Sequence, residues 1–165
     1  MNARPPKSRV RELFAGLLLI ACLVVVLTAT MWPTPLDKDY GASIVKFLDV
    51  VHRNGVPEWF GYNKLEFSAN ILMFIPIGFL VTLLLPAHVW WLALILCPLV
   101  SAGIELTQAT LLSSRFATVN DLLANSTGAV IGILCAVILR ALVYDRDQKL
   151  VARALWENGV RQPVG

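Results

Sequence analysis

The sequence has little charge for its length. Of its 165 residues only 15% are Asp, Glu, Lys or Arg, whereas 57% are hydrophobic. An ordinary soluble domain carries about 25% charged residues, and its core could not enclose so many apolar side chains. The composition therefore excludes a soluble globular domain and predicts a chain whose solvent is largely the lipid bilayer.

Cysteine and histidine are also scarce. Each of Cys22, Cys97 and Cys135 lies alone within an apolar run, and His52 and His88 are far apart. An odd number of widely spaced cysteines argues against a disulfide framework, and no pair of these residues has the spacing of zinc ligands. We expect neither a metal site nor a cofactor. The net charge of only +3 gives no argument for a nucleic-acid partner.

Long apolar runs are typical of membrane-spanning helices, and this chain has several. The first run carries no charge and exceeds the core of a signal peptide, usually about 7–15 residues, and no good cleavage site follows it. We therefore predict an all-α membrane protein with a bundle of four transmembrane helices. Their expected ranges are 13–32, 67–85, 89–112 and 121–143.

The distribution of Lys and Arg predicts the orientation of this bundle. Nine of these residues flank the membrane domain on the side of the two termini, and five lie on the other side. Because basic residues favour the cytoplasm, both termini are expected there. The chain would then comprise a basic cytoplasmic N-terminus (1–12), a four-helix membrane domain (13–143) and a charged cytoplasmic tail (144–165) with one short helix around Leu150.

The outer loop between the first two spans contains an amphipathic segment. In SIVKFLDVVHR, residues 43–53, apolar side chains recur at helical spacing opposite Lys46, Asp49 and Arg53. This pattern predicts a short helix, either interfacial on the outer leaflet or packed against the top of the bundle. Both positions remain open.

Polar side chains gather at the expected outer ends of the last three spans. On the third, Ser101, Glu105 and Gln108 share one helical face, and Glu105 lies about 10 Å below the outer end. Ionisable residues inside a membrane are costly and usually functional, so we predict one polar, ligand-binding site in the outer leaflet. The expected members are Glu66, Asn70, Glu105, Gln108, Arg115, Asp121 and Asn125.

Two structural explanations compete with a binding site. Interhelical hydrogen bonds could use the same side chains to hold a small bundle together. The segment TVND, residues 118–121, also resembles a capping box, in which Thr118 is the N-cap residue of the fourth helix and Asp121 is its partner three residues later. Four further residues are expected to shape the helices: Pro76 and Gly78 in the second span, and Gly128 and Gly132, whose spacing allows another helix to approach closely.

Three linked motifs carry a resemblance to a known family. The segments NILMFIPIGF (70–79), IELTQ (104–108) and RFATVNDLLANSTGAVIG (115–132) resemble the VanZ-like family of bacterial membrane proteins. The resemblance covers roughly residues 30 to 140. It implies a multi-pass protein of the bacterial plasma membrane, and its name-giving member is associated with low-level resistance to the glycopeptide teicoplanin.

Three functions are compatible with this pattern. The leading hypothesis is a non-enzymatic protein that binds an envelope lipid, a lipid-linked wall precursor or a lipoglycopeptide at the outer leaflet. An enzyme acting on a lipid-linked head group could use Glu105 and Asp121 as acid and base, although no nucleophile–base pair is visible. A small proton-coupled transporter or flippase is the third hypothesis, and it would require a homodimer formed through Gly128 and Gly132.

Overall fold

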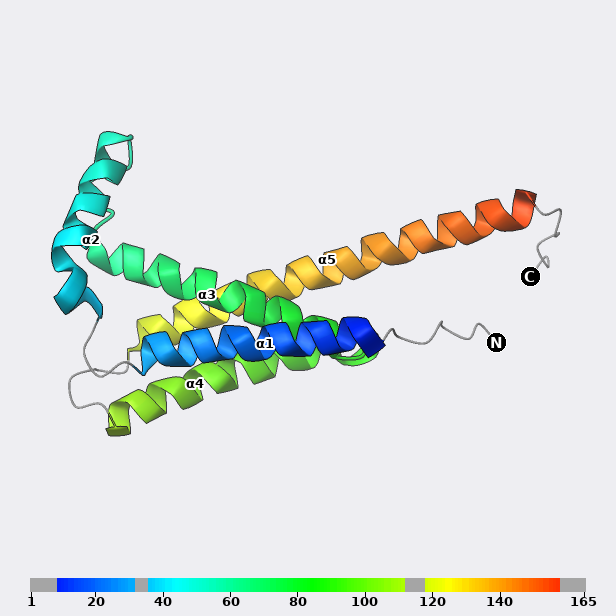
Figure 1. Ribbon diagram of the computed structural model, residues 1–165, viewed down its shortest axis with the longest axis horizontal. Helices are drawn as coiled ribbons and strands as arrows, with labels where there is room; N and C mark the ends of the chain where they lie inside the picture. The colour runs from blue at the N-terminus through cyan, green and yellow to red at the C-terminus, as the bar shows by residue number, and fades with distance from the viewer. Residues whose placement is uncertain (1–8, 32–35, 112–117, 158–165) are drawn as a thin grey trace.

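The computed structural model describes residues 9–31, 36–111 and 118–157, which form helices joined by short connections and include no strand. Figure 1 shows the spans gathered into a bundle, with the two ends of the chain at the same end of it. Four helical stretches in the described residues are long and apolar enough to cross a membrane. In chain order the elements are α1 (Arg9–Thr30), α2 (Leu36–Arg53), α3 (Tyr62–Leu84), the 3-10 helix η1 (Ala87–Leu92), α4 (Ala93–Leu111) and α5 (Val119–Glu157).

A ladder of small residues brings α5 against α3, and these two helices make the most extensive contact in the bundle. Ala124, Gly128, Gly132 and Ala136 follow each other at intervals of four and are all buried. A Cβ atom added to Gly128 would clash with the backbone oxygen of Ile71, and one added to Gly132 would clash with that of Ile75. The two helices therefore approach each other closely at these glycines, and the neighbour is α3 of the same chain.

Gly78 completes this crossing from the side of α3. A Cβ atom at Gly78 would clash with the backbone oxygen of Ala129 on α5. Its neighbour Pro76 lies within α3, which continues through it as one helix. Proline has no N–H, so the carbonyl of Leu72 loses its usual helical partner there.

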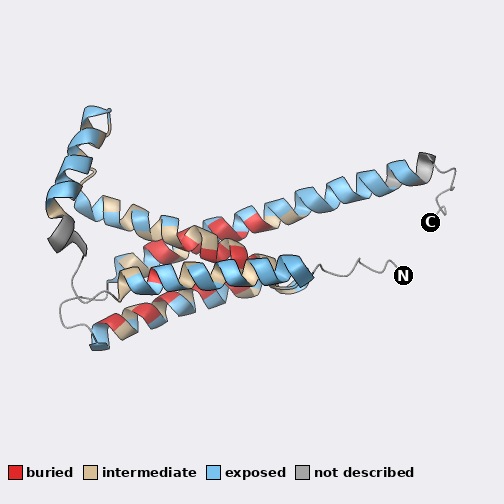
Figure 2. Ribbon diagram, viewed as in Figure 1, coloured by how far each residue is buried: buried red, intermediate tan, exposed pale blue. Residues whose placement is uncertain are grey.

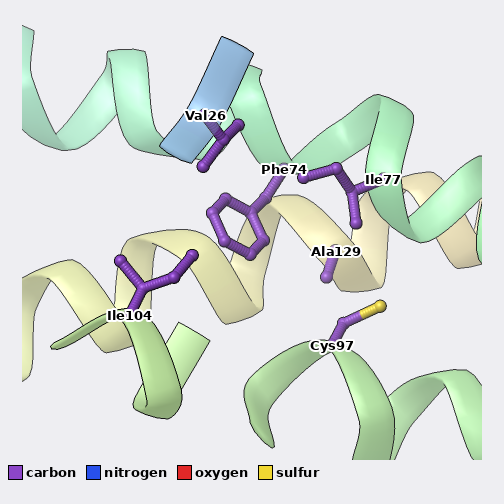
Figure 3. Close-up of a cluster of buried hydrophobic side chains, with 6 residues drawn as sticks. All are labelled: Val26, Phe74, Ile77, Cys97, Ile104 and Ala129. Carbon is purple, nitrogen blue, oxygen red and sulfur yellow. The ribbon is translucent and has the colours of Figure 1, made fainter. Parts of the chain in front are cut away.

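Side chains from all four spans meet in one apolar core. Figure 3 shows Phe74 of α3 between Val26 of α1 and Ile104 of α4, with Cys97 close to Ala129. Phe74 and Ile77 are among the largest fully buried side chains of the described residues. The core therefore ties α1 and α4 to the α3–α5 pair.

Most of the remaining apolar surface faces outward. In α1 only Val26 is buried, and its leucine, isoleucine and valine side chains are largely exposed. Figure 2 shows the same exposure along α1, whereas buried positions concentrate where α3, α4 and α5 meet. Exposed apolar surface on this scale is not tolerated in water, so these faces are matched to lipid.

The spans differ from their predicted ranges at several ends. The second span begins at Tyr62, five residues before the predicted start, and the third is preceded by η1, which occupies the predicted first turn at 89–92. The largest difference is in α5, which continues to Glu157 instead of ending at Val143. Residues 133–157 contain no glycine or proline that would interrupt the helix. Asp145 also forms an ion pair of 2.6 Å with Lys149, one turn later in the same helix. The predicted separate helix around Leu150 is therefore part of α5.

The amphipathic segment forms α2, which is longer than predicted. Figure 1 shows α2 at the end of the bundle opposite the termini, running across the direction of the spans. It has no extensive contact with any other described helix. The turn that follows Arg53 contains Gly55, whose φ of +97° suits glycine, and the N–H of Val56 donates to Val51 O at 3.3 Å.

Candidate functional site: a polar network at one end of the bundle

The start of α5 is held by a reciprocal pair of hydrogen bonds. The N–H of Asp121 donates to Thr118 Oγ1 at 3.1 Å, and the Thr118 hydroxyl donates to Asp121 Oδ2 at 2.6 Å. This is the arrangement expected of a capped helix N-terminus, where the first N–H groups lack helical partners. The capping role predicted for Thr118 and Asp121 is present in the structure.

Two residues of other spans extend this cap into an interhelical network. Asn70 of α3 donates its Nδ2 to Asp121 Oδ1 at 2.8 Å. Glu105 of α4 accepts the backbone N–H of Thr118 at Oε2, with a distance of 3.3 Å. The network therefore joins α3, α4 and the start of α5, and both of its carboxylates lie at the positive end of the α5 dipole.

A second contact between α4 and α5 lies one turn deeper. Asn125 follows Asp121 by four residues, and Ser101 precedes Glu105 by four, so the two pairs lie on the same faces. Asn125 Nδ2 donates to Ser101 Oγ at 2.9 Å. Asn125 is only 3% exposed and Ser101 is fully buried, yet Asn125 Oδ1 has no hydrogen-bond partner in the part of the chain that the structure describes. A buried amide oxygen without a donor is uncommon and costs free energy.

Gln108 connects α4 to α1 at the same end. It is 6% exposed, and its Nε2 donates to the backbone oxygen of Thr30 at 2.8 Å. Thr30 is the last residue of α1, so this carbonyl is one that the helix cannot satisfy itself. Thr30 was absent from the predicted site, because a backbone carbonyl gives no distinctive signal in sequence. Ser101 was placed on the same helical face as Glu105 and Gln108 but was not counted among the expected members.

The structure brings most of the predicted residues together. Asn70, Glu105 and Asp121 belong to one connected network, with Asn125 and Gln108 in separate contacts beside it. Glu66 has an exposed side chain on α3, one turn before Asn70. Arg115 lies outside the described residues.

Arg140 makes polar contacts at the opposite end of the bundle. The sequence predicted no such contact, because Arg140 was used only in the count of basic residues that predicts the orientation. It occupies the next step of the small-residue ladder after Ala136, where α3 ends. Its Nη2 donates to Leu83 O at 2.8 Å and to Leu85 O at 2.6 Å, while Nη1 is buried without a partner among the described residues. An isolated arginine after a long uncharged stretch was the signal that could have found it. Polar ties between helices are thus present at both ends of the bundle.

Among the described residues, this polar network offers both hydrogen-bond donors and hydrogen-bond acceptors. Each of three carboxamides donates one N–H to a protein oxygen, and the carboxylates of Glu105 and Asp121 accept hydrogen bonds. No group of three or more His, Cys, Asp or Glu side chains that could hold a metal occurs among the described residues.

Fold and network together define a small, all-helical, multi-span membrane protein with polar side chains concentrated at one end. Comparison with known families is consistent with this class: the model of the family described as VanZ/LLP1 matches residues 16–140. The chain therefore belongs to the VanZ/LLP1 family. No curated protein and no solved structure gives a significant match.

Proposed function

We propose that this protein sits in the bacterial plasma membrane with both termini in the cytoplasm and the polar network in the outer leaflet. The shared position of the two termini and the basic residues near them, such as Arg9, Arg11 and Arg146, support this orientation. With this orientation α2 lies at the outer surface, across the spans. Its exposed Val45, Phe47 and Val50 are suited to the interfacial region of the outer leaflet.

In this orientation the protein acts as a non-enzymatic binder of an envelope lipid or a lipid-linked wall precursor. The ligand's head group contacts the seam between α4 and α5, and its apolar part lies beside α2. The family relationship and the concentration of carboxylates at one end support this function.

The observation that carries the proposal is the placement of the Glu105 carboxylate beside the start of α5, where its Oε2 accepts the backbone N–H of Thr118. The Thr118 N–H needs only an acceptor, and a glutamine oxygen would supply one at a much lower cost of membrane insertion. Interhelical hydrogen bonding accounts for an acceptor at this position, and the positive end of the α5 dipole favours a carboxylate there. In the proposed function a lipid head group interacts with the same carboxylate.

Glu105→Gln tests this function because it keeps the acceptor and removes the charge. The protein is purified in mild detergent, and its bound lipids are identified by mass spectrometry and compared between the two forms. We expect the glutamine variant to lose a lipid that the native protein retains. Thr127→Val is the matched control, because the Thr127 hydroxyl is exposed on α5 and bonds only within its own helix, to Leu123 O. Identical lipid profiles in all three proteins would contradict the proposal.

Reduced glycopeptide susceptibility would follow from binding at this site. A protein that holds the wall precursor or the lipid tail of the drug alters the access of teicoplanin to its target. Cells expressing the native protein should then tolerate more teicoplanin than cells expressing Glu105→Gln at equal abundance. Equal susceptibility of the two kinds of cell would show that the protein does not reduce teicoplanin susceptibility through Glu105, and it would not contradict the proposed lipid binding.

A further inference from the structure

Two of the spans carry a proline at the same depth. Pro76 lies within α3 and Pro98 lies within α4. At a helical rise of 1.5 Å per residue, each proline is about 20 Å from the outer end of its helix. Because proline has no N–H, the carbonyl four residues earlier loses its helical partner, and a helix bends most easily at such a position.

The α3 helix is held against α5 on both sides of its proline. Before Pro76, the backbone of Ile71 lies where a Cβ atom on Gly128 would be. After it, a Cβ atom on Gly78 would overlap the backbone of Ala129. A bend at Pro76 would separate backbones that are in direct contact, so α3 and α5 are expected to move as one unit.

The part of α4 beyond its proline lacks a comparable contact at its one glycine. Among the described residues, nothing lies within 4 Å of a carbon added to Gly103. Figure 1 shows α3 and α4 diverging toward the end where α2 lies. Ile104 anchors this part of α4 in the apolar core, and hydrogen bonds join it to Asn125, to Thr118 and to the end of α1. Each of these contacts depends on a single side chain of α4, so this part of the helix is held less firmly than α3.

We propose that the part of α4 beyond Pro98 is a gate in the outer half of the bundle. It bends outward at the proline, and the seam between α4 and the α3–α5 pair then opens to the surrounding lipid. Opening separates Ser101 from Asn125 and exposes Asn125 Oδ1, which is enclosed without a partner among the described residues while the gate is closed. The bend itself does not depend on lipid binding, whereas its use as the entry for a lipid rests on the proposed function.

Distances between spin labels test the gate in the full-length protein in nanodiscs. With the three native cysteines replaced by alanine, labelled cysteines are introduced by Lys64→Cys on α3 together with Leu111→Cys on α4. Lys64→Cys together with Leu123→Cys on α5 is the reference pair, and all three of these side chains are exposed. Double electron–electron resonance measures the distribution of distances within each pair.

We expect two distances between α3 and α4 and one between α3 and α5, because only the first pair spans the gate. Pro98→Ala restores the missing helical hydrogen bond, so it should lower the population of the longer α3–α4 distance about fivefold, the factor that one hydrogen bond supplies. Pro76→Ala is the matched control. It restores a bond in a helix that is already held on both sides, and it should leave both distributions unchanged.

A single α3–α4 distance in the native protein would overturn the gate, and this result does not require Pro98→Ala to fold. A longer distance that Pro98→Ala leaves unchanged, or that Pro76→Ala lowers equally, would overturn it too. If the gate fails while Glu105→Gln still loses its lipid, the proposed binding stands without it. If the gate responds to Pro98→Ala in a protein that retains no lipid, the bend is established and its role as a lipid entry is wrong.

Discussion

Thr118 makes several of the hydrogen bonds in the polar network at the start of α5, through its side chain and its backbone N–H. Its hydroxyl both donates to and accepts from Asp121, and its N–H donates to Glu105 on another helix. Glu105 has two properties that a mutation can separate, the oxygen that accepts this N–H and the charge that the oxygen carries. The stability of the bundle therefore depends on the acceptor oxygen of Glu105, whereas the proposed lipid binding depends on its charge.

Replacing Thr118 with valine should destabilise the protein, because it removes both hydroxyl bonds at the start of α5. Loss of a helix N-cap costs about 1 kcal/mol of unfolding free energy. Thr118→Ser keeps the hydroxyl and should remain close to the native protein. Unfolding monitored by circular dichroism in detergent measures the difference. If Thr118→Val were as stable as Thr118→Ser, the cap would have no energetic role.

Arg140 should contribute to stability at the other end. Arg140→Met keeps a long apolar stem but removes the donors to Leu83 O and Leu85 O, at a cost of about 1–3 kcal/mol of unfolding free energy. Arg140→Lys should recover part of the loss. Arg146→Met is the control, since the same substitution there affects an exposed side chain on α5. Comparable unfolding curves for Arg140→Met and Arg146→Met would contradict the assignment.

At the scale of helices, α5 organises the molecule. Its small-residue ladder faces α3, its Asn125 faces α4, and the pair it forms with α3 carries the core. Because backbone atoms of α3 lie where the missing side chains of Gly128 and Gly132 would be, the crossing depends on those positions remaining glycine. A homodimer through these glycines, which the transporter hypothesis requires, would have to displace α3.

Gly132→Ala should lower the unfolding free energy by about 1–3 kcal/mol, because its methyl group would overlap the Ile75 backbone and force the helices apart. Gly103→Ala is the matched control on α4, where nothing lies within 4 Å of the added carbon. That substitution should be neutral or stabilising by about 0.5–1 kcal/mol, since alanine favours helix. Thermal unfolding of the two variants compares them directly. Equal effects at the two positions would show that the α3–α5 crossing is not tightly packed.

Much of this arrangement could be predicted from the sequence, and the remainder depends on tertiary contacts. Four apolar runs and the spacing of Gly128 and Gly132 predicted the spans and a close helix contact. The end of α5 was misplaced because apolarity declines after Val143 while helix-forming residues continue to Glu157. The contacts of Gln108 with Thr30 O and of Arg140 with Leu83 O could not be predicted, because a backbone carbonyl is present at every position.

At the scale of the whole molecule, the helices differ greatly in length. The 22 residues of α1 span about 33 Å, close to the hydrocarbon thickness of about 30 Å, whereas the 39 residues of α5 span about 58 Å. Figure 1 shows the second half of α5 extending beyond the other spans at the end where the termini lie. In the proposed orientation this extension enters the cytoplasm.

Cysteine labelling in intact cells tests that orientation. Cys22, Cys97 and Cys135 are first replaced by alanine, and a single cysteine is then placed by Asn54→Cys near the end of α2 or by Gln148→Cys on the α5 extension. Both positions are exposed. An impermeant maleimide should label the first in intact cells and the second only after the membrane is opened. Labelling of Gln148→Cys in intact cells would show that the α5 extension lies outside the cell and would contradict the proposed orientation.

The central claim is that the carboxylate of Glu105 serves a ligand in addition to the bundle. Its most direct test measures lipid retention and the free energy of unfolding on the same preparations of native protein and Glu105→Gln. We predict that the unfolding free energy changes by no more than about 1 kcal/mol, the size of a charge–dipole contribution, while the retained lipid is lost. If unfolding and lipid retention decline together, or if the lipid is retained in full, Glu105 has only a structural role and the claim is wrong.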